Sequence, residues 1–258
     1  MTWLAVWLIG VGLADLVRAG AGAGTTALRV AMAAGAGVIA VLAVLTGLTA
    51  PVDLVCLAVS LVPLVLWVRL SAEVATTGSG SWPALVSLAA GVVWLVALSG
   101  WASPAGGPFG RWLQWADLPL VGAGASPSHV LLVAGLLLVN LATANVVVRL
   151  VLLAVGAMRP VLALDTASDP QPSDQLRGGR LLGPMERVLI IGLGLAGQLT
   201  AAGLVIAAKG LIRFPELQAK RDDRSSVDGV GIDAVTEYFL VGSFVSWLVA
   251  LGSLALTR

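Results

Sequence analysis

Three glycines in the C-terminal third of the chain have the spacing of a dinucleotide-binding loop. Gly192, Gly194 and Gly197 spell G-x-G-x-x-G directly after the apolar run VLII, and the acidic Glu216 follows at a suitable distance. In a Rossmann fold such glycines let the backbone approach a pyrophosphate at the start of a helix, while the acidic side chain binds a ribose. The chemistry to consider first is therefore the binding of NAD or FAD.

The residues around these glycines argue against a dinucleotide. Residues 188–208 contain no ionisable side chain, whereas a Rossmann helix needs one polar face for the solvent. The motif also has meaning only within a strand–helix–strand unit, and the upstream chain offers apolar helices instead. In lipid, small residues let neighbouring helices approach closely. We therefore predict that these glycines serve helix packing, as do those of the stretch AMAAGAGVIA (31–40), and that no dinucleotide binds.

Charged and amide side chains at the borders of apolar segments form a second candidate set. Arg187, Gln198 and Lys209 are eleven residues apart, or three helical turns, so on one continuous helix they would share a face. We expect Glu237 to pair with Lys209 or with Arg213; the alternative is that Lys209 anchors its helix at the lipid headgroups. The complete candidate seam, to which no catalytic role is assigned, comprises Glu186, Arg187, Gln198, Lys209, Arg213, Glu237, Asn140, Asn145 and Arg149.

The two amides and the arginine of the seam that precede residue 150 lie within one apolar segment. Such side chains either hydrogen-bond between helices or line a solute path, and the first role is the commoner. Neither metal ligation nor hydrolysis is predicted elsewhere. Cys56 and His129 are the only cysteine and histidine. Ser128 and Asp117 are near His129 along the chain, but a hydrolytic triad is defined by geometry. We interpret His129 as an interfacial residue, with Ser126 or Ser128 as helix N-cap.

The composition predicts that lipid surrounds these residues. Of 258 residues, 58% are hydrophobic and 11% charged, whereas soluble domains carry about 25% charged residues. The net charge of +1 gives no general attraction to nucleic acid. A helix needs about 20 apolar residues to cross the hydrocarbon. We predict an all-α transmembrane bundle of about seven spans, the first of them short: 3–17, 30–48, 54–70, 83–101, 130–157, 188–208 and 238–256.

Two hydrophilic loops organise the chain. Residues 158–185 separate a five-helix part (1–157) from a two-helix part (186–258), and residues 214–235 form the second loop. Both loops are basic, so the positive-inside rule predicts that both lie in the cytoplasm. A single span between them would put them on opposite sides of the membrane. We expect an ordinary span; the alternative is that the chain turns back around 192–197. The other loops favour a cytoplasmic 158–185 loop and an outside N-terminus. Residues 107–120, with Trp112 and Trp115, are predicted to lie at the interface.

Three C-terminal stretches, GGRLLGPMERVLI, GQLTAAGLVIAAKGLIRFPE and EYFLVGSFVSWLVAL, resemble a bacterial membrane family of unknown function. The resemblance covers about residues 178–250 and implies a multi-span membrane protein without implying a reaction. Asp15 lies in an early helix, but the histidine expected near it in that family is absent. The matching positions are Gly179, Arg180, Gly183, Glu186, Arg187, Gln198, Lys209, Arg213, Phe214, Glu237, Tyr238 and Gly242.

These observations predict an integral protein of the bacterial cytoplasmic membrane with no cofactor and no metal. The first expectation is an accessory or scaffold subunit, bound to another protein or to its own copies, because small-residue faces are many and no catalytic set is found. The alternative is a transporter or channel for a small solute or ion. A membrane enzyme acting on lipid is the third. A transporter should hold polar groups near the membrane midplane, and a scaffold should expose a small-residue face.

Overall fold

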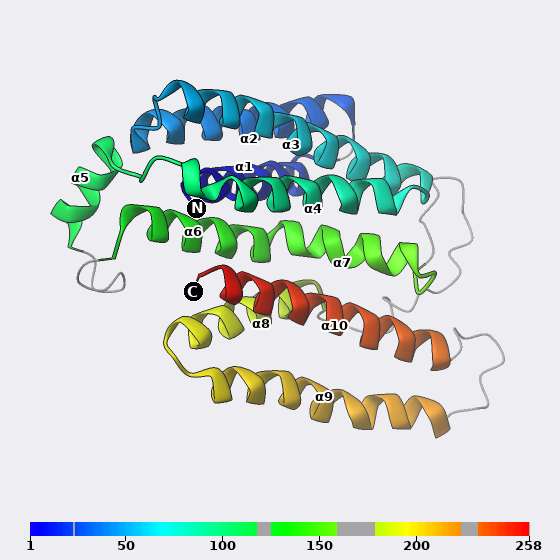
Figure 1. Cartoon of the computed structure of the whole chain (residues 1–258). Helices are drawn as coiled ribbons and strands as arrows, with labels where there is room; N and C mark the ends of the chain where they lie inside the picture. The colour runs from blue at the N-terminus through cyan, green and yellow to red at the C-terminus, as the bar shows by residue number, and fades with distance from the viewer. Residues whose placement is uncertain (23, 118–124, 159–178, 223–231, 258) are drawn as a thin grey trace. The chain divides into compact units, whose positions relative to one another are not determined.

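The computed structural model describes residues 1–22, 24–117, 125–158, 179–222 and 232–257, apart from the side chains of 179–181, 212–222 and 232–235. These residues form ten α-helices and one short 3₁₀ helix, with no β-strand among them, so the all-α class is confirmed (Figure 1). The helices are α1 (Thr2–Ala21), α2 (Thr25–Thr46), α3 (Pro51–Thr77), α4 (Ser81–Ala97), η1 (Ser99–Trp101), α5 (Gly107–Ala116), α6 (Pro127–Leu141), α7 (Thr143–Ala154), α8 (Gly179–Leu195), α9 (Leu199–Asp222) and α10 (Ile232–Leu256).

Four helices are long and apolar enough to cross a membrane: α1, α2, α3 and the Thr236–Leu256 part of α10. The pair α6 and α7, bent by 45°, is a fifth candidate, while α4 and the Leu199–Leu211 part of α9 are apolar but shorter. The described residues thus support four or five spans by length and composition, and the seven predicted are not confirmed. The first segment is longer than expected, because α1 has 20 residues.

The helices pack as two units, which are described separately. The N-terminal unit comprises Met1–Ala72 and Trp82–Thr143, and the C-terminal unit comprises Glu73–Ser81 and Ala144–Leu256. In the N-terminal unit α1 packs against α2 and α6, and its Trp3 and Trp7 are fully buried. α1 and α2 meet at glycines: a Cβ added to Gly35 would lie 2.8 Å from the Gly10 carbonyl oxygen. Gly35 therefore serves the close helix packing that was predicted for the stretch 31–40, whereas Gly37 in the same stretch is exposed.

The predicted span 130–157 is interrupted after Leu141. Asn140 is fully buried and its side-chain amide donates to the Leu136 carbonyl oxygen at 2.9 Å. A side chain that bonds the backbone within a helix competes with the regular ladder and commonly marks a bend. The next helix begins at Thr143, which is also buried. Polar residues therefore lie directly at the bend between α6 and α7.

The predicted single span 188–208 is wrong, because the chain turns back within it. α8 ends at Leu195 and α9 begins at Leu199, and the two helices pack against each other as a hairpin (Figure 1). Gly197 has φ +76°, the Gln198 amide donates to the Leu193 carbonyl (2.8 Å), and the Gly197 amide donates to the Gly194 carbonyl (3.1 Å). These two bonds around a left-handed glycine are a Schellman motif, which satisfies the last carbonyls of α8.

The remaining glycines of the fingerprint pack or face outward. A Cβ on Gly194 would overlap the Leu254 side chain, so this glycine lets α8 lie against α10. A Cβ on Gly192 would meet nothing within 4 Å. Gly197 thus ends α8, Gly194 allows close contact with α10, and Gly192 has no neighbour within 4 Å. None of them follows a strand, which is the context that a dinucleotide-binding loop requires.

The predicted interfacial segment 107–120 contains the short helix α5. Pro108 lies in its first turn, and the helix packs against α2 and α6 in the N-terminal unit. The Gly106 amide donates to the Thr46 carbonyl oxygen at 2.8 Å, which ties the start of α5 to the end of α2. Trp112 and Trp115 are exposed. Exposed tryptophans on a short amphipathic helix are what a headgroup-level element requires, and the interfacial position stays a prediction.

Candidate functional site

The α8–α9 hairpin brings opposite charges together in the interior of the C-terminal unit. Glu186 on α8 and Lys209 on α9 form an ion pair with Nζ 2.5 Å from Oε2. The lysine side chain is 15% exposed and the glutamate side chain 6%. The same ammonium lies 5.8 Å from the centre of the Trp247 ring on α10, within the range of a cation–π contact. Lys209 therefore joins all three helices α8, α9 and α10.

Arg187, next to Glu186, is 2% exposed and links α8 to two further helices. Its Nη1 donates to the Ser246 hydroxyl on α10 at 2.9 Å, and its Nη2 donates to the Asn145 side-chain oxygen on α7 at 2.5 Å. Gly183, one helical turn earlier, lies beside the guanidinium, and a Cβ there would be in ordinary contact with Nη1 at 3.5 Å. We call the set Glu186, Arg187, Lys209, Asn145, Ser246 and Trp247 the charged cluster.

The position of the charged cluster along α10 sets its depth. Ser246 is the central residue of Thr236–Leu256, the part of α10 that is long enough to cross a membrane. A bilayer around that segment would place the cluster at its midplane. One charged side chain at the centre of a membrane helix costs about 2.5–3.5 kcal/mol on insertion scales. Three such groups on adjacent helices are therefore tolerable only because they bind one another and neighbouring polar groups.

The structure gathers some residues of the predicted seam and leaves others apart. Glu186, Arg187, Lys209 and Asn145 come together. The predicted Lys209–Glu237 pair is wrong: Lys209 pairs with Glu186, and Glu237 is exposed near the start of α10. The side chain of Arg213 lies outside the described residues. The others take separate positions: Gln198 is exposed at the hairpin turn, Arg149 is exposed on α7, and Asn140 is buried in the N-terminal unit.

The eleven-residue spacing failed because it assumed an unbroken helix through Gly197. Ser246 and Trp247 were not predicted as site residues. In sequence, Ser246 is a small residue of an apolar helix, and its position indicates helix packing. One signal was available in the sequence. A glycine followed within three residues by a second apolar helical run is a common helix stop, and Gly197 has that context.

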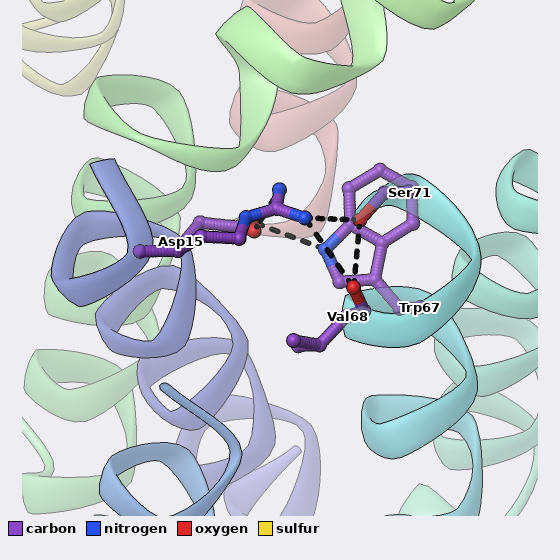
Figure 2. Close-up of polar contacts among 5 residues, drawn as sticks. Asp15, Trp67, Val68 and Ser71 are labelled. Carbon is purple, nitrogen blue, oxygen red and sulfur yellow. Dashed lines mark hydrogen bonds and ion pairs between the residues drawn. The ribbon is translucent and has the colours of Figure 1, made fainter. Parts of the chain in front are cut away.

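A second polar set joins α1 to α3 in the N-terminal unit (Figure 2). The Asp15 side chain is 1% exposed; its Oδ1 accepts from Arg18 Nη2 and its Oδ2 from the Trp67 indole N–H, both at 2.9 Å. Arg18 Nη1 also donates to the Ser71 hydroxyl at 2.7 Å and to the Val68 carbonyl at 3.3 Å. Both carboxylate oxygens thus have partners, and the aspartate serves as a fixed acceptor within the unit.

The same two helices are joined along their length by tryptophans. The Trp3 indole donates to Asp53 Oδ1 at 2.6 Å, and the Trp7 indole donates to the Ser60 carbonyl at 2.8 Å. These bonds and the Asp15–Trp67 bond connect residues separated by 50 to 53 positions. A constant separation means that α1 and α3 run in the same direction. We call these three contacts the α1–α3 ladder.

We expect Trp67→Phe to lower the free energy of unfolding by about 1–3 kcal/mol, because it leaves an acceptor oxygen of the buried Asp15 without its donor. Thermal unfolding of the detergent-solubilised protein measures the change. Trp82→Phe is the matched control, since Trp82 is 64% exposed and its loss removes no bond in the ladder. Equal effects of the two variants would contradict a structural role for the Asp15–Trp67 bond.

The serines near His129 have structural roles. Ser126 caps α6, with its side chain accepting from the His129 amide at 3.3 Å, so this N-cap prediction is confirmed. The Ser128 hydroxyl lies 3.1 Å from the Thr2 hydroxyl and accepts from the Ala105 amide at 2.8 Å. These contacts connect Ser128 to α1 and to the segment before α5. Among the described residues, no group of three His, Cys, Asp or Glu side chains is placed to hold a metal ion.

Fold and site together define a class: a helical protein with several helices suited to a membrane and a cluster of charges buried among them. No protein-family model, no curated protein and no solved structure matches the chain. The resemblance of residues 178–250 to a bacterial membrane family therefore stays a prediction.

Proposed function

We propose that the chain is a multi-pass protein of the bacterial cytoplasmic membrane that moves a small ion or solute through its C-terminal unit. The charged cluster would be the polar binding site along this path. The observation that carries this proposal is the burial of Glu186 and Arg187, with the half-buried Lys209 paired to Glu186, at the level of Ser246, the centre of an apolar span. Ionisable side chains at that depth are costly and typically belong to ion or solute pathways.

Interrupted helices beside the charged cluster support the same function. Transporters place their binding sites near the midplane on discontinuous helices, because broken helices supply polar backbone groups there. α8 and α9 are separated at Gly197, and Asn145, which binds Arg187, lies three residues beyond Ala142 at the bend of α6 and α7. An accessory subunit without transport needs neither the breaks nor the buried charges.

The hairpin also removes the contradiction in membrane orientation. If α8 and α9 each cross, the loops before and after them lie on one side of the membrane, and the positive-inside rule is satisfied for both. With α4 and the α6–α7 pair as single crossings, the count runs from an outside N-terminus to a cytoplasmic side that holds both the connection from α7 to α8 and the connection from α9 to α10. The basic residues that then share the cytoplasmic side are Arg159, Arg177, Arg180, Lys220, Arg221 and Arg224.

In the described conformation the charged groups of the cluster bind one another and neighbouring polar side chains, so that no ion can pass between them. Passage of an ion would require Glu186 and Lys209 to separate, each exchanging its partner for the ion or for water. The Gly197 turn and the bend at Ala142 are the places where the backbone could absorb such a movement. The Glu186–Lys209 pair is therefore the contact whose loss should alter transport most.

Proteoliposomes test this function with two probes, trapped lucigenin for chloride and trapped pyranine for protons, under a potassium diffusion potential. We expect the purified protein to raise the flux of one ion about tenfold or more above protein-free liposomes, and Lys209→Gln to remove most of that gain. Lys209→Arg keeps the charge and Gln198→Ala changes only the exposed turn, so both should retain flux. Fluxes of both ions equal to those of empty liposomes would overturn the proposal.

A scaffold is the second candidate, and one observation favours it. The small residues of α9 at Thr200, Gly203, Ala207 and Gly210 recur at helical spacing and are exposed, and a Cβ on either glycine would meet nothing within 4 Å. Gly10, Gly35 and Gly194 show how glycines are used where two helices of this chain touch. Purification in mild detergent followed by mass spectrometry tests it: a stoichiometric second protein, together with no ion flux, would favour the scaffold over transport.

A further inference from the structure

We infer that water reaches the charged cluster from the side of the membrane at which α10 begins, so that the C-terminal unit contains an aqueous path through half of the bilayer. What the path carries rests on the proposed function; the existence of the path does not. The inference follows from the register of three helices and from the change of polarity along two of them.

Contacts with α10 fix the register of the hairpin. Arg187 binds Ser246, and Gly194, seven residues later, packs against Leu254, eight residues after Ser246. α8 and α10 therefore run in the same direction, and their ends after these contacts lie at the same level (Figure 1). α9 returns in the opposite direction, with Lys209 over Trp247. Glu186, Arg187 and Lys209 thus lie at the level of the middle of α10.

The polarity of α8 and α9 changes at this same level. Between the cluster and the hairpin turn, residues 188–195 and 199–208 contain no charged side chain. On the other side of the cluster, α8 begins with GRLLGPMER and α9 ends with KGLIRFPELQAKRD. These polar halves run beside the first half of Thr236–Leu256, whose sequence TEYFLVGSFVS is largely apolar. Polar helix halves therefore lie at a depth where α10 is suited to lipid.

Energetics decide what surrounds the polar halves. Residues 199–208 extend about 15 Å along the helix, so the next ten residues, 209–218, would fill the other half of the roughly 30 Å hydrocarbon thickness. Their sequence holds three ionisable residues, Lys209, Arg213 and Glu216, and each would cost a few kcal/mol if lipid surrounded it. Polar or irregular segments at membrane depth persist where protein or a water-filled cavity surrounds them. Water is the surround that also supplies ions to the Glu186–Lys209 pair.

The ligand class of this path is water with small hydrated ions, and its inner end is the Glu186–Lys209 pair. In the proposed orientation the path opens toward the cytoplasm, the side at which α8 begins and α9 ends. From the opposite side, the apolar segments 188–195 and 199–208 should keep water away from the cluster. In the described conformation the path thus reaches the cluster from one side only, and nothing passes beyond the Glu186–Lys209 pair, as alternating access requires.

Cysteine accessibility tests the path in the full-length protein. With Cys56→Ser as background, we introduce Lys209→Cys and Gly183→Cys on the polar side, and Val205→Cys and Gly192→Cys on the apolar side. Inside-out membrane vesicles are treated with a membrane-impermeant methanethiosulfonate, and residual thiols are counted with a maleimide after denaturation in SDS. Gly183 and Gly192 lie on α8, and Val205 and Lys209 lie on α9, so each polar-side variant is compared with an apolar-side variant on the same helix. Gly192 is the more exposed of its pair, so exposure alone predicts the reverse order.

We expect the two polar-side cysteines to react at least about tenfold faster than the two apolar-side cysteines, because thiolates form and react in water far faster than thiols in lipid. In right-side-out vesicles all four should stay unreactive. Gly183→Cys leaves the ion pair intact, so it reports even if Lys209→Cys unfolds. Polar-side cysteines that react as slowly as their controls in both inside-out and right-side-out vesicles would overturn the inference, whether lipid or another protein covers them, and fast reaction in right-side-out vesicles would reverse only the orientation.

The flux experiment and the labelling experiment can give negative results independently of each other. Fast labelling on the polar side without ion flux in proteoliposomes would support the aqueous path and overturn the proposed function. Ion flux without labelling would support the function and overturn the path. Neither experiment depends on knowing the natural solute, because the labelling probe reports water and the flux probes are chloride and protons.

Discussion

Lys209→Met is expected to lower the free energy of unfolding by about 3–5 kcal/mol, because removal of one partner of a buried ion pair leaves the other charge without compensation. Here that charge is Glu186, whose side chain is 6% exposed and whose ion-pair partner is Lys209. The methionine also loses the cation–π contact with Trp247, which adds to the cost. Unfolding of the protein in mixed micelles by increasing SDS, followed by circular dichroism, measures the change.

Two further variants separate the charge from the side-chain volume. Glu186→Gln combined with Lys209→Met removes both charges and should recover much of the loss, since replacement of a whole buried pair is often neutral. Arg111→Met removes a cation that is exposed on the short helix α5, outside the candidate spans, and should change stability by less than about 0.5 kcal/mol. A Lys209→Met protein as stable as the Arg111→Met protein would show that the ion pair contributes nothing to the fold.

The sequence sufficed for the helical class and for the helices whose apolar runs are uninterrupted, such as α2, α3 and α10. It did not suffice for residues 188–208, whose composition is the same whether the chain crosses once or turns back at Gly197. The outcome depends on a Schellman motif, in which two backbone amides satisfy carbonyls at the end of α8. The contradictory basic loops were the better indication, because a hairpin is what lets both lie on one side.

The partners of the buried charges could not be read from the sequence for a related reason. Helix periodicity shows which residues share a face of one continuous helix, whereas Glu186 and Lys209 lie on two helices joined by a turn. The α1–α3 ladder shows the same limit at longer range: Asp15 finds Trp67 only after two helices have packed in parallel. Individual polar residues in apolar helices were recognisable as costly, and the tertiary fold decided which of them pair.

Gly35→Leu is expected to destabilise the N-terminal unit by about 3 kcal/mol or more, because overpacking against a rigid neighbour forces helices apart. A Cβ at Gly35 would lie 2.8 Å from the backbone oxygen of Gly10 and 3.1 Å from the Ala14 Cβ. A backbone oxygen within α1 cannot move aside as a flexible side chain can. α1 is the buried centre of its unit, so its displacement from α2 should also loosen the contacts of Trp3 and Trp7.

Gly37→Leu provides the matched control, on the same helix and two residues away. Gly37 is exposed, and a Cβ there would meet nothing within 4 Å, so leucine should be tolerated and should favour the helix by up to about 1 kcal/mol relative to glycine. Detergent-resistant fraction after heating, read by fluorescence size-exclusion chromatography, compares the two variants. If Gly35→Leu survived heating as well as Gly37→Leu, α1 and α2 could not be in backbone contact at Gly10 and Gly35.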